Sequence, residues 1–283
     1  MIKFVNAKIN LGLRVLRRRA DGYHDLSTVF YPVGLYAGTP DDSGHLCDVL
    51  EITPSVSDSL SLSGVPVDCE PEQNLVWKTL RLFRNLCPDC PQVQIGLDKH
   101  LPSQAGLGGG SADASFTLLA LNEICGHPLD ERQLVQAAAS LGADCPFFIV
   151  NRPCLASGVG EVLTPIDLDL SGLWAAVVKP EASISTAQAF KGVLPSVPEI
   201  PVEEVMRLPL GQWRDALVND FEVSAFALHP EFIEIKEYLY VSGAIYASMS
   251  GSGSAFYGIY RTRAEAERAA ADVGLPFATV ALL

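Results

Sequence analysis

A glycine-rich stretch, residues 102–115, has the composition of a phosphate-binding loop. It reads PSQAGLGGGSADAS and holds four glycines within five positions. An alternating apolar run that ends at Lys99 precedes it and predicts a strand, and the run 112–124 that follows predicts a helix. Glycines let a ligand touch the backbone, and a helix start offers unpaired N–H groups and a partial positive charge. The sequence therefore predicts an anion site here, most often one for phosphate.

The end of this loop argues against the two best-known nucleotide motifs. A P-loop ends in Gly-Lys-Ser/Thr, whereas this loop ends in Gly110, Ser111 and Ala112. The dinucleotide fingerprint G-x-G-x-x-G needs a third glycine where Ser111 stands. A flexible linker is disfavoured as well, because both flanks are strongly periodic and linkers are usually polar on both sides.

Two charged residues outside the loop are candidates for chemistry. The apolar side chains of residues 9–15 alternate, so Lys8, Asn10 and Gly12 are expected on the opposite face, away from the core. There the lysine and the asparagine either converge on a ligand or simply face solvent. Asp144 follows a predicted helix and stands close to a proline and two phenylalanines. It is either a helix N-cap, which this pattern slightly favours, or a functional carboxylate.

The amino-acid composition and the net charge predict a folded chain without a nucleic-acid or membrane surface. The 283 residues are 48% apolar and 19% charged, and the net charge of −13 opposes binding to nucleic acid or anionic lipid. No apolar run is long enough to cross a bilayer, and the N-terminus does not read as a signal peptide. Seven scattered cysteines predict reduced thiols in the cytoplasm, with Cys87 and Cys90 in a turn rather than a zinc site.

Strands and helices mix without a strict βαβ order, which predicts an α+β fold. The length suits two modest domains or one large one, and the division expected is 1–150 and 151–283. Asp130 is expected to cap a helix that closes at Gly142, and Thr186 to cap a short helix. Further strands are expected at 27–35, 48–53, 174–178, 255–260 and 277–282. Helices are expected at 74–86, at 262–273 and at 216–240, the last with a break at Pro230, and a loop is expected at 41–44.

Six motifs stand in the order found in one family of kinases. They are NAKINL at 6–11, RADGYH at 19–24, the glycine loop at 105–112, LGAD at 141–144, GVGE at 158–161 and SGSGS at 250–254. In these six motifs and their order the chain resembles the GHMP kinases, and the resemblance extends from about residue 2 to residue 260. The resemblance implies a two-domain α+β fold whose active site lies in the cleft between the domains. It also implies ATP as phosphoryl donor, with Mg²⁺ whose ligands it does not assign.

The resemblance implies a role for each matching residue. Lys8 and Asp144 would be the catalytic pair, with the carboxylate accepting the proton of the attacking hydroxyl and the lysine stabilising the developing charge. The residues implied for ATP are Asn74, Lys99, Pro102, Ser103, Gln104, Ala105, Gly106, Leu107, Gly108, Gly109, Gly110, Ser111 and Ala112.

The first two motifs together narrow the resemblance to a member with a cytidine diphosphate sugar alcohol as acceptor. This member phosphorylates a 2-hydroxyl in the non-mevalonate synthesis of isoprenoid precursors. Tyr23 and Phe190 would sandwich the cytosine, and His24 would hydrogen-bond its edge. Thr186 would help to hold this substrate, and Asn10 would fix the acceptor.

The chain departs from the family pattern at three loop positions. Gln104 stands where glycine is usual, Ser103 replaces an apolar residue, and Ala112 replaces a serine. The alternatives are another small-molecule kinase of the family, of the homoserine or mevalonate type, and a nucleotide-binding module without catalysis. The aromatic set argues against the first, because those acceptors carry no base to stack, and the catalytic pair argues against the second.

Overall fold

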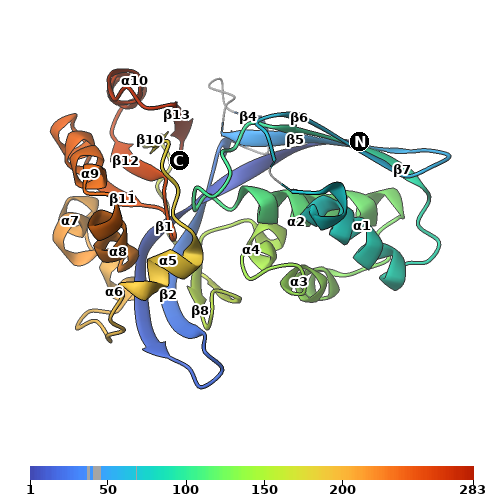
Figure 1. Ribbon diagram of the computed structural model, residues 1–283, viewed down its shortest axis with the longest axis horizontal. Helices are drawn as coiled ribbons and strands as arrows, with labels where there is room; N and C mark the ends of the chain where they lie inside the picture. The colour runs from blue at the N-terminus through green and yellow to red at the C-terminus, as the bar shows by residue number, and fades with distance from the viewer. Residues whose placement is uncertain (37–38, 41–45, 68) are drawn as a thin grey trace.

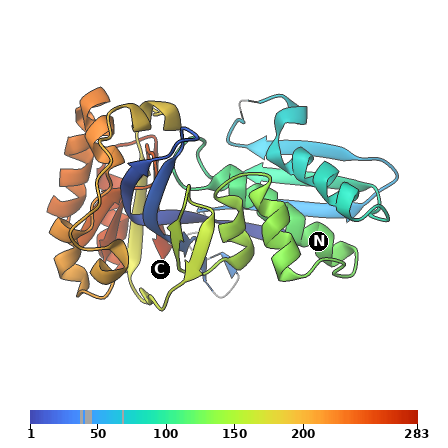
Figure 2. The ribbon, with the colours of Figure 1, turned by 90° about the horizontal axis from the view of Figure 1, so that it is seen from below.

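The computed structural model describes residues 1–36, 39–40, 46–67 and 69–283. Two lobes share the long strand β1 (Ile2–Arg18). One lobe combines a seven-stranded sheet with four helices, and the other combines a four-stranded sheet with six (Figures 1 and 2). The predicted α+β class is confirmed. The loop expected at 41–44 lies outside the described residues.

The large sheet has β1 near its middle. Its order is β6-β7-β5-β1-β2-β8-β9, and every pair except β6–β7 is antiparallel. The other strands are β2 (His24–Val33), β5 (Cys47–Pro54), β6 (Ser59–Gly64), β7 (Val93–Lys99), β8 (Cys154–Ser157) and β9 (Val162–Pro165). A separate two-stranded ribbon joins β3 (Leu35–Tyr36) and β4 (Thr39–Pro40).

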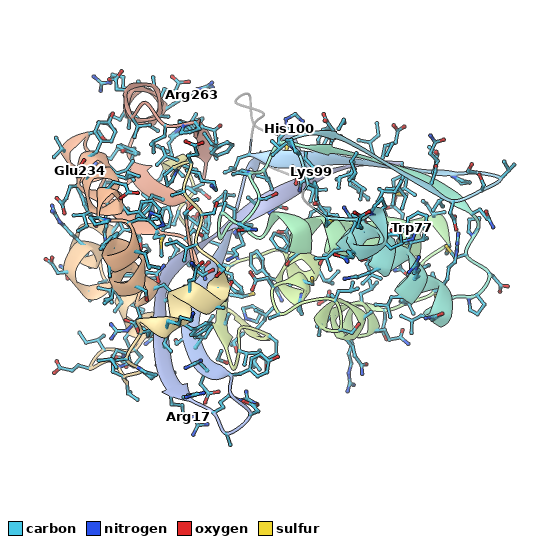
Figure 3. All side chains as sticks on the ribbon, in the orientation of Figure 1. Arg17, Trp77, Lys99, His100, Glu234 and Arg263 are labelled. Carbon is cyan, nitrogen blue, oxygen red and sulfur yellow. The ribbon has the colours of Figure 1, made fainter. Side chains whose placement is uncertain are left out.

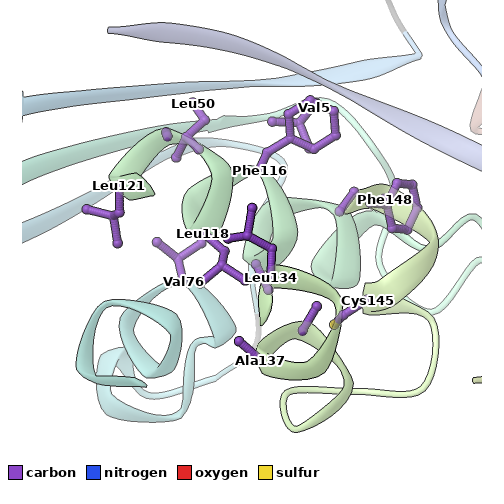
Figure 4. Close-up of a cluster of buried hydrophobic side chains, with 14 of the residues drawn as sticks. Val5, Leu50, Val76, Phe116, Leu118, Leu121, Leu134, Ala137, Cys145 and Phe148 are labelled. Carbon is purple, nitrogen blue, oxygen red and sulfur yellow. The ribbon is translucent and has the colours of Figure 1, made fainter. Parts of the chain in front are cut away.

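Four helices cover one face of this sheet and bury an apolar core against it (Figure 4). Val5 and Leu50 of the sheet meet Phe116, Leu118 and Leu121 of the central helix. The helices are α1 (Leu75–Leu86), α2 (Gly109–Ile124), α3 (Glu131–Ala139) and α4 (Cys145–Val150), and the 3₁₀ turn η1 (Pro71–Gln73) precedes the first of them.

The second lobe is a four-stranded antiparallel sheet between two cores. Along its strand β10 (Trp174–Lys179), Ala175 and Val177 pack in a core with Ile9 of β1, whereas Ala176 and Val178 pack on helices. The other strands are β11 (Tyr246–Met249), β12 (Phe256–Tyr260) and β13 (Phe277–Leu282). The helices are α5 (Thr186–Lys191), α6 (Val202–Val205), α7 (Trp213–Ala216), α8 (Phe221–Leu228), α9 (Glu231–Val241) and α10 (Arg263–Asp272), with the 3₁₀ turn η2 (Leu210–Gln212).

Helix starts differ from the sequence predictions where capping decides them. Helix α2 begins at Gly109 instead of 112, because Gly108 in a left-handed conformation is its N-cap. Asp130 caps α3 as predicted, but the helix ends at Ala139, before Gly142. Thr186 is not a cap, since Ser185 forms a capping box with Gln188 and Thr186 is the first helical residue.

The predicted domain boundary after residue 150 stays a prediction. Strands β8 and β9 follow that point, yet they extend the large sheet beside β2. Within the described part of the chain, no helix combines the length and apolarity needed to span a bilayer.

Candidate active site

Strand β1 carries Lys8 into the interior between the lobes. Lys8 is 3% exposed and Asn10 2%, and Gly12 is buried, so the alternative that this face simply points to solvent is wrong, and Lys8 and Asn10 line a cavity instead. The glycine-rich loop covers the face, and the Lys8 amide donates a hydrogen bond to the Leu107 carbonyl at 3.0 Å. Gly108 is left-handed and lies so close that an added Cβ would stand 2.7 Å from the Phe148 ring.

The Lys8 ammonium is held by three neighbours. Its Nζ lies 3.4 Å from Asp144 Oδ2, donates to Asn10 Oδ1 at 2.5 Å, and stands 4.8 Å from the centroid of the Phe30 ring. Burial lowers the pKa of Lys8, and the Asp144 carboxylate acts in the opposite direction. A buried ammonium beside a carboxylate is a pair suited to handling developing charge.

Asp144 stands directly before α4 in the N-cap position, but its side chain makes no capping hydrogen bond. The cap interpretation, which the sequence slightly favoured, is therefore wrong. The carboxylate turns to Lys8 and keeps 35% of its side chain exposed. It is thus available both to a cation behind it and to a ligand in front of it.

Two turns rich in glycine interlock beside this pair. Gly106 lies against the turn after β11, where an added Cβ would stand 1.9 Å from the Ser250 carbonyl oxygen. The Ser250 hydroxyl donates to the Gly106 carbonyl at 2.8 Å and accepts from the Asn10 amide at 3.2 Å. Ala255 N donates to the Ala105 carbonyl at 3.0 Å. One lobe therefore braces the loop that belongs to the other.

The departures from the family pattern have visible consequences. Gln104 adopts a left-handed φ of 50°, a conformation that glycine reaches without strain, and its carbonyl accepts from Ser254 N at 3.3 Å. Ala112 is fully buried in the core below the loop, and its amide donates to Gly108 O. Ala112 therefore does not line the ligand cavity, and its predicted contact with ATP is not supported by this arrangement.

Two cavities meet at Asp144. The first, of about 630 Å³, is lined by the loop residues 102–111 and by Asn74 and Lys99. The second, of about 490 Å³, is lined by Lys8, Asn10, Tyr23, His24 and Phe190. Four residues line both cavities, namely Gly106, Asp144, Thr186 and Ser252. The structure thus gathers nearly all the predicted site residues around two adjoining spaces.

Two residues implied for ATP outside the loop, Asn74 and Lys99, also have structural partners. Asn74 caps α1, with its Oδ1 accepting from Val76 N at 2.9 Å. Lys99, at the end of β7 (Figure 3), bridges the buried carboxylates of Asp48 and Asp113. Its ammonium is therefore engaged within the cavity wall.

The aromatic residues of the second cavity differ in arrangement from the predicted sandwich. His24 itself stacks on Phe190, with ring centroids 4.6 Å apart and planes 17° from parallel, and Phe221 meets Phe190 edge-on. Tyr23 lies at the rim and is 65% exposed. A base stacked on this face of Phe190 would have to displace the His24 ring. The Thr186 hydroxyl lies 3.3 Å from Ser252 Oγ.

Sequence reasoning missed the residues behind Lys8 and Asp144. Asn10 was predicted to fix the acceptor, but its amide is engaged inside the protein, with Oδ1 on Lys8 and Nδ2 on Thr28 Oγ1 at 3.0 Å. Ser250 and Phe30 were not singled out individually, and Thr28 not at all. The available signal for Thr28 was a polar residue inside a predicted strand, directly before the apolar run that begins at Val29.

Comparisons with known proteins agree with the geometry. Residues 74–152 match the family model of the GHMP kinases N terminal domain, and residues 202–278 match that of the GHMP kinases C terminal. The chain belongs to the GHMP kinases.

Curated relatives within the family are more specific. The chain is 47% identical over 274 residues to the 4-diphosphocytidyl-2-C-methyl-D-erythritol kinase of Porphyromonas gingivalis, covering 95% of this chain and 96% of the relative. The enzyme of the same name from Bacteroides thetaiotaomicron is 47% identical over 264 residues, or 92% of each chain. A crystal structure of 4-(cytidine 5'-diphospho)-2C-methyl-D-erythritol kinase is 35% identical over 100% of both chains, with a TM-score of 0.83. A homoserine kinase from Cytophaga hutchinsonii, at 13% identity over 98% of this chain and 94% of its own, has a TM-score of 0.65 and shares the fold alone.

Proposed function

We propose that the chain transfers the γ-phosphoryl group of ATP to the 2-hydroxyl of 4-diphosphocytidyl-2-C-methyl-D-erythritol, giving the 2-phosphate and ADP, a step in isoprenoid precursor synthesis. The relatives' names and their high coverage of this chain support this acceptor over homoserine or mevalonate. The observation that carries the proposal is the junction of the two cavities at Asp144, with Lys8 3.4 Å from its carboxylate.

The cysteines support a cytoplasmic location for the enzyme. Six of them are free thiols, as is usual in the reducing cytoplasm: Cys69, Cys87, Cys90, Cys125, Cys145 and Cys154.

Phosphoryl transfer depends mainly on positioning and on stabilising charge. The first turn of α2, Gly109 to Ser111, lines the larger cavity, and the N–H groups of a helix start have no intrahelical acceptors. These groups and the positive end of the helix dipole hold the triphosphate. The acceptor hydroxyl enters from the smaller cavity, Asp144 takes its proton, and the Lys8 ammonium stabilises the oxygen as it attacks.

The Mg²⁺ that accompanies ATP in such reactions fits the oxygen donors present. Among the described residues no group of three or more His, Cys, Asp or Glu could hold a metal alone. Ser111 and Asp144, however, both line the triphosphate cavity and offer a hydroxyl and a carboxylate. Mg²⁺ commonly binds phosphate oxygens with only one or two protein groups, and there it neutralises charge on the transferred group.

A coupled assay of ADP release tests the proposal. The protein with Mg²⁺ and ATP should release ADP when the diphosphocytidyl substrate is added, and should stay near its background rate with mevalonate or homoserine. CDP should raise the melting temperature, whereas mevalonate and homoserine should not, because only CDP carries a base and a diphosphate. Turnover of mevalonate or homoserine instead would replace the proposed acceptor.

Replacing Phe190 by alanine should raise KM for the cytidine substrate about tenfold and leave KM for ATP within twofold. Phe190 lines only the smaller cavity, and losing one aromatic contact to a base costs on the order of 1–3 kcal/mol. Steady-state kinetics with each substrate varied in turn measures the split. Phe226→Ala, which removes an aromatic ring of the same lobe outside both cavities, is the control. Equal rises in both KM values would refute a role in stacking.

A further inference from the structure

Thr28 lies behind the catalytic pair, on the strand next to β1. It is 1% exposed and belongs to β2, and the register between the two strands slips at Gly12, where Leu11 pairs with Val29 and Leu13 pairs with Thr28. The Thr28 hydroxyl donates to the Gly12 carbonyl at 2.5 Å. The same oxygen lies 3.0 Å from Asn10 Nδ2.

The proton count of this hydroxyl fixes the orientation of Asn10. A hydroxyl has one hydrogen, and a carbonyl oxygen can only accept, so the Thr28 hydrogen goes to Gly12. The lone pairs that remain can only accept, and the donor that faces them is the Asn10 amide nitrogen. The Asn10 oxygen must then point the other way, to the Lys8 ammonium at 2.5 Å.

The opposite orientation of the amide is strongly disfavoured while Thr28 is present. It would turn an NH₂ group toward an ammonium and an oxygen toward a hydroxyl that has no hydrogen left to give. The three residues are each at most 3% exposed, so solvent offers little to offset these contacts. The hydroxyl therefore sets which face of Asn10 the lysine meets.

We propose that Thr28 is a positioning residue that acts through Asn10 to hold the Lys8 ammonium in place beside Asp144. The inference rests on the proposed function for its effect on turnover, and on the hydrogen bonds alone for the orientation of Asn10. Thr28 lies in the wall of the smaller cavity, but its hydroxyl is bonded to Gly12 and Asn10, so its link to Asp144 runs through Asn10 and Lys8.

The test compares Thr28→Val, which keeps the shape and lacks the hydroxyl, with Thr28→Ser, which keeps the hydroxyl. Thr28→Val should lower kcat about tenfold, because a lost buried hydrogen bond costs roughly 1–2 kcal/mol, and leave both KM values within twofold. Thr28→Ser should keep at least half of the wild-type kcat. An unchanged kcat in Thr28→Val overturns the proposal, and so does an equal loss in Thr28→Ser. If Thr28→Val does not fold, Thr28→Ala replaces it with the same expectations.

A double variant shows whether Thr28 acts through Asn10. In an Asn10→Ala background, Thr28→Val should cause no further loss of kcat, because the group that it orients is gone. If the kcat losses of the two single variants multiply in the double variant, Thr28 acts by another route, and the proposal is overturned.

One measurement does not depend on turnover. Hydrogen exchange of the Asn10 side-chain NH₂, followed by NMR without substrate, should be slow in wild type and Thr28→Ser and at least tenfold faster in Thr28→Val. Equal exchange in all three proteins would refute the positioning role. A wild-type protein that shows this protection but no turnover of the cytidine substrate would refute the proposed function alone.

Discussion

Asp144→Asn should lose turnover by a factor of about 10²–10⁴ and keep its fold and its affinity for ATP. The carboxylate is the group at the junction of the two cavities that can accept the proton of an attacking hydroxyl, and an amide cannot. The change should hardly affect stability, because Asp144 makes no capping hydrogen bond and its side chain is 35% exposed. The ADP-release assay, the melting temperature and a titration with ATP measure the three quantities.

Asp130→Asn is the matched control for this variant. It removes the same charge at another helix start, and asparagine caps a helix about as well as aspartate. Asp130 lines neither cavity, so its variant should turn over at the wild-type rate. Near-normal turnover of Asp144→Asn would remove the base from the mechanism and leave the carboxylate as a partner of Lys8 only.

The glycine-rich loop was the part of the site that the sequence predicted best. The periodic strand before it and the helix after it are both present, and Gly106 and Gly108 adopt the positive φ values that such a loop uses. These features are local, because they depend on residues that are neighbours in the chain. Local pattern also identified Asp130 as a cap, since a capping box spans only four residues.

Predictions that depended on packing between distant segments were the ones that failed. Alternation along β1 correctly separated Lys8 from Ile9, but it could not tell that a loop a hundred residues later covers the lysine. The choice between cap and functional group for Asp144 needed the same information. The amide of Asn10 has a partner on β2, and a strand partner cannot be read from spacing within one strand.

Lys99→Met should lower the free energy of unfolding by about 3–5 kcal/mol at pH 8.5, the typical cost of removing one partner from a buried ion pair. The Lys99 ammonium contacts Asp48 and lies 2.6 Å from Asp113 Oδ2, and all three side chains are almost completely buried. Without it, two carboxylates face each other away from water. Urea denaturation measures the loss, and Lys78→Met, at an exposed position on α1, should change stability by no more than about 0.5 kcal/mol.

The dependence of this loss on pH distinguishes a charge effect from a packing effect. Burial, together with the nearby Asp48, raises the pKa of Asp113 to about 8, and the Lys99 ammonium acts in the opposite direction. The folded protein therefore keeps a proton on Asp113 that the unfolded chain releases above about pH 4, so this group's contribution to stability falls as the pH rises toward 8. A protonated Asp113 needs no counterion, so Lys99→Met should cost less at pH 5.5 than at pH 8.5.

The double variant Lys99→Met/Asp113→Asn completes the comparison. Asp48 keeps hydrogen bonds from the amides of His100 at 2.6 Å and Leu101 at 2.8 Å, so it tolerates loss of the lysine better than Asp113 does. Removing the Asp113 charge as well should therefore restore part of the lost stability and flatten its dependence on pH between 5.5 and 8.5. A Lys99→Met protein within 1 kcal/mol of wild type at both pH values would show that the ammonium does not balance these carboxylates. Because Asp48 and Asp113 hold the two ends of the glycine-rich loop to one lysine, such a result would also require another explanation of how that loop is fixed.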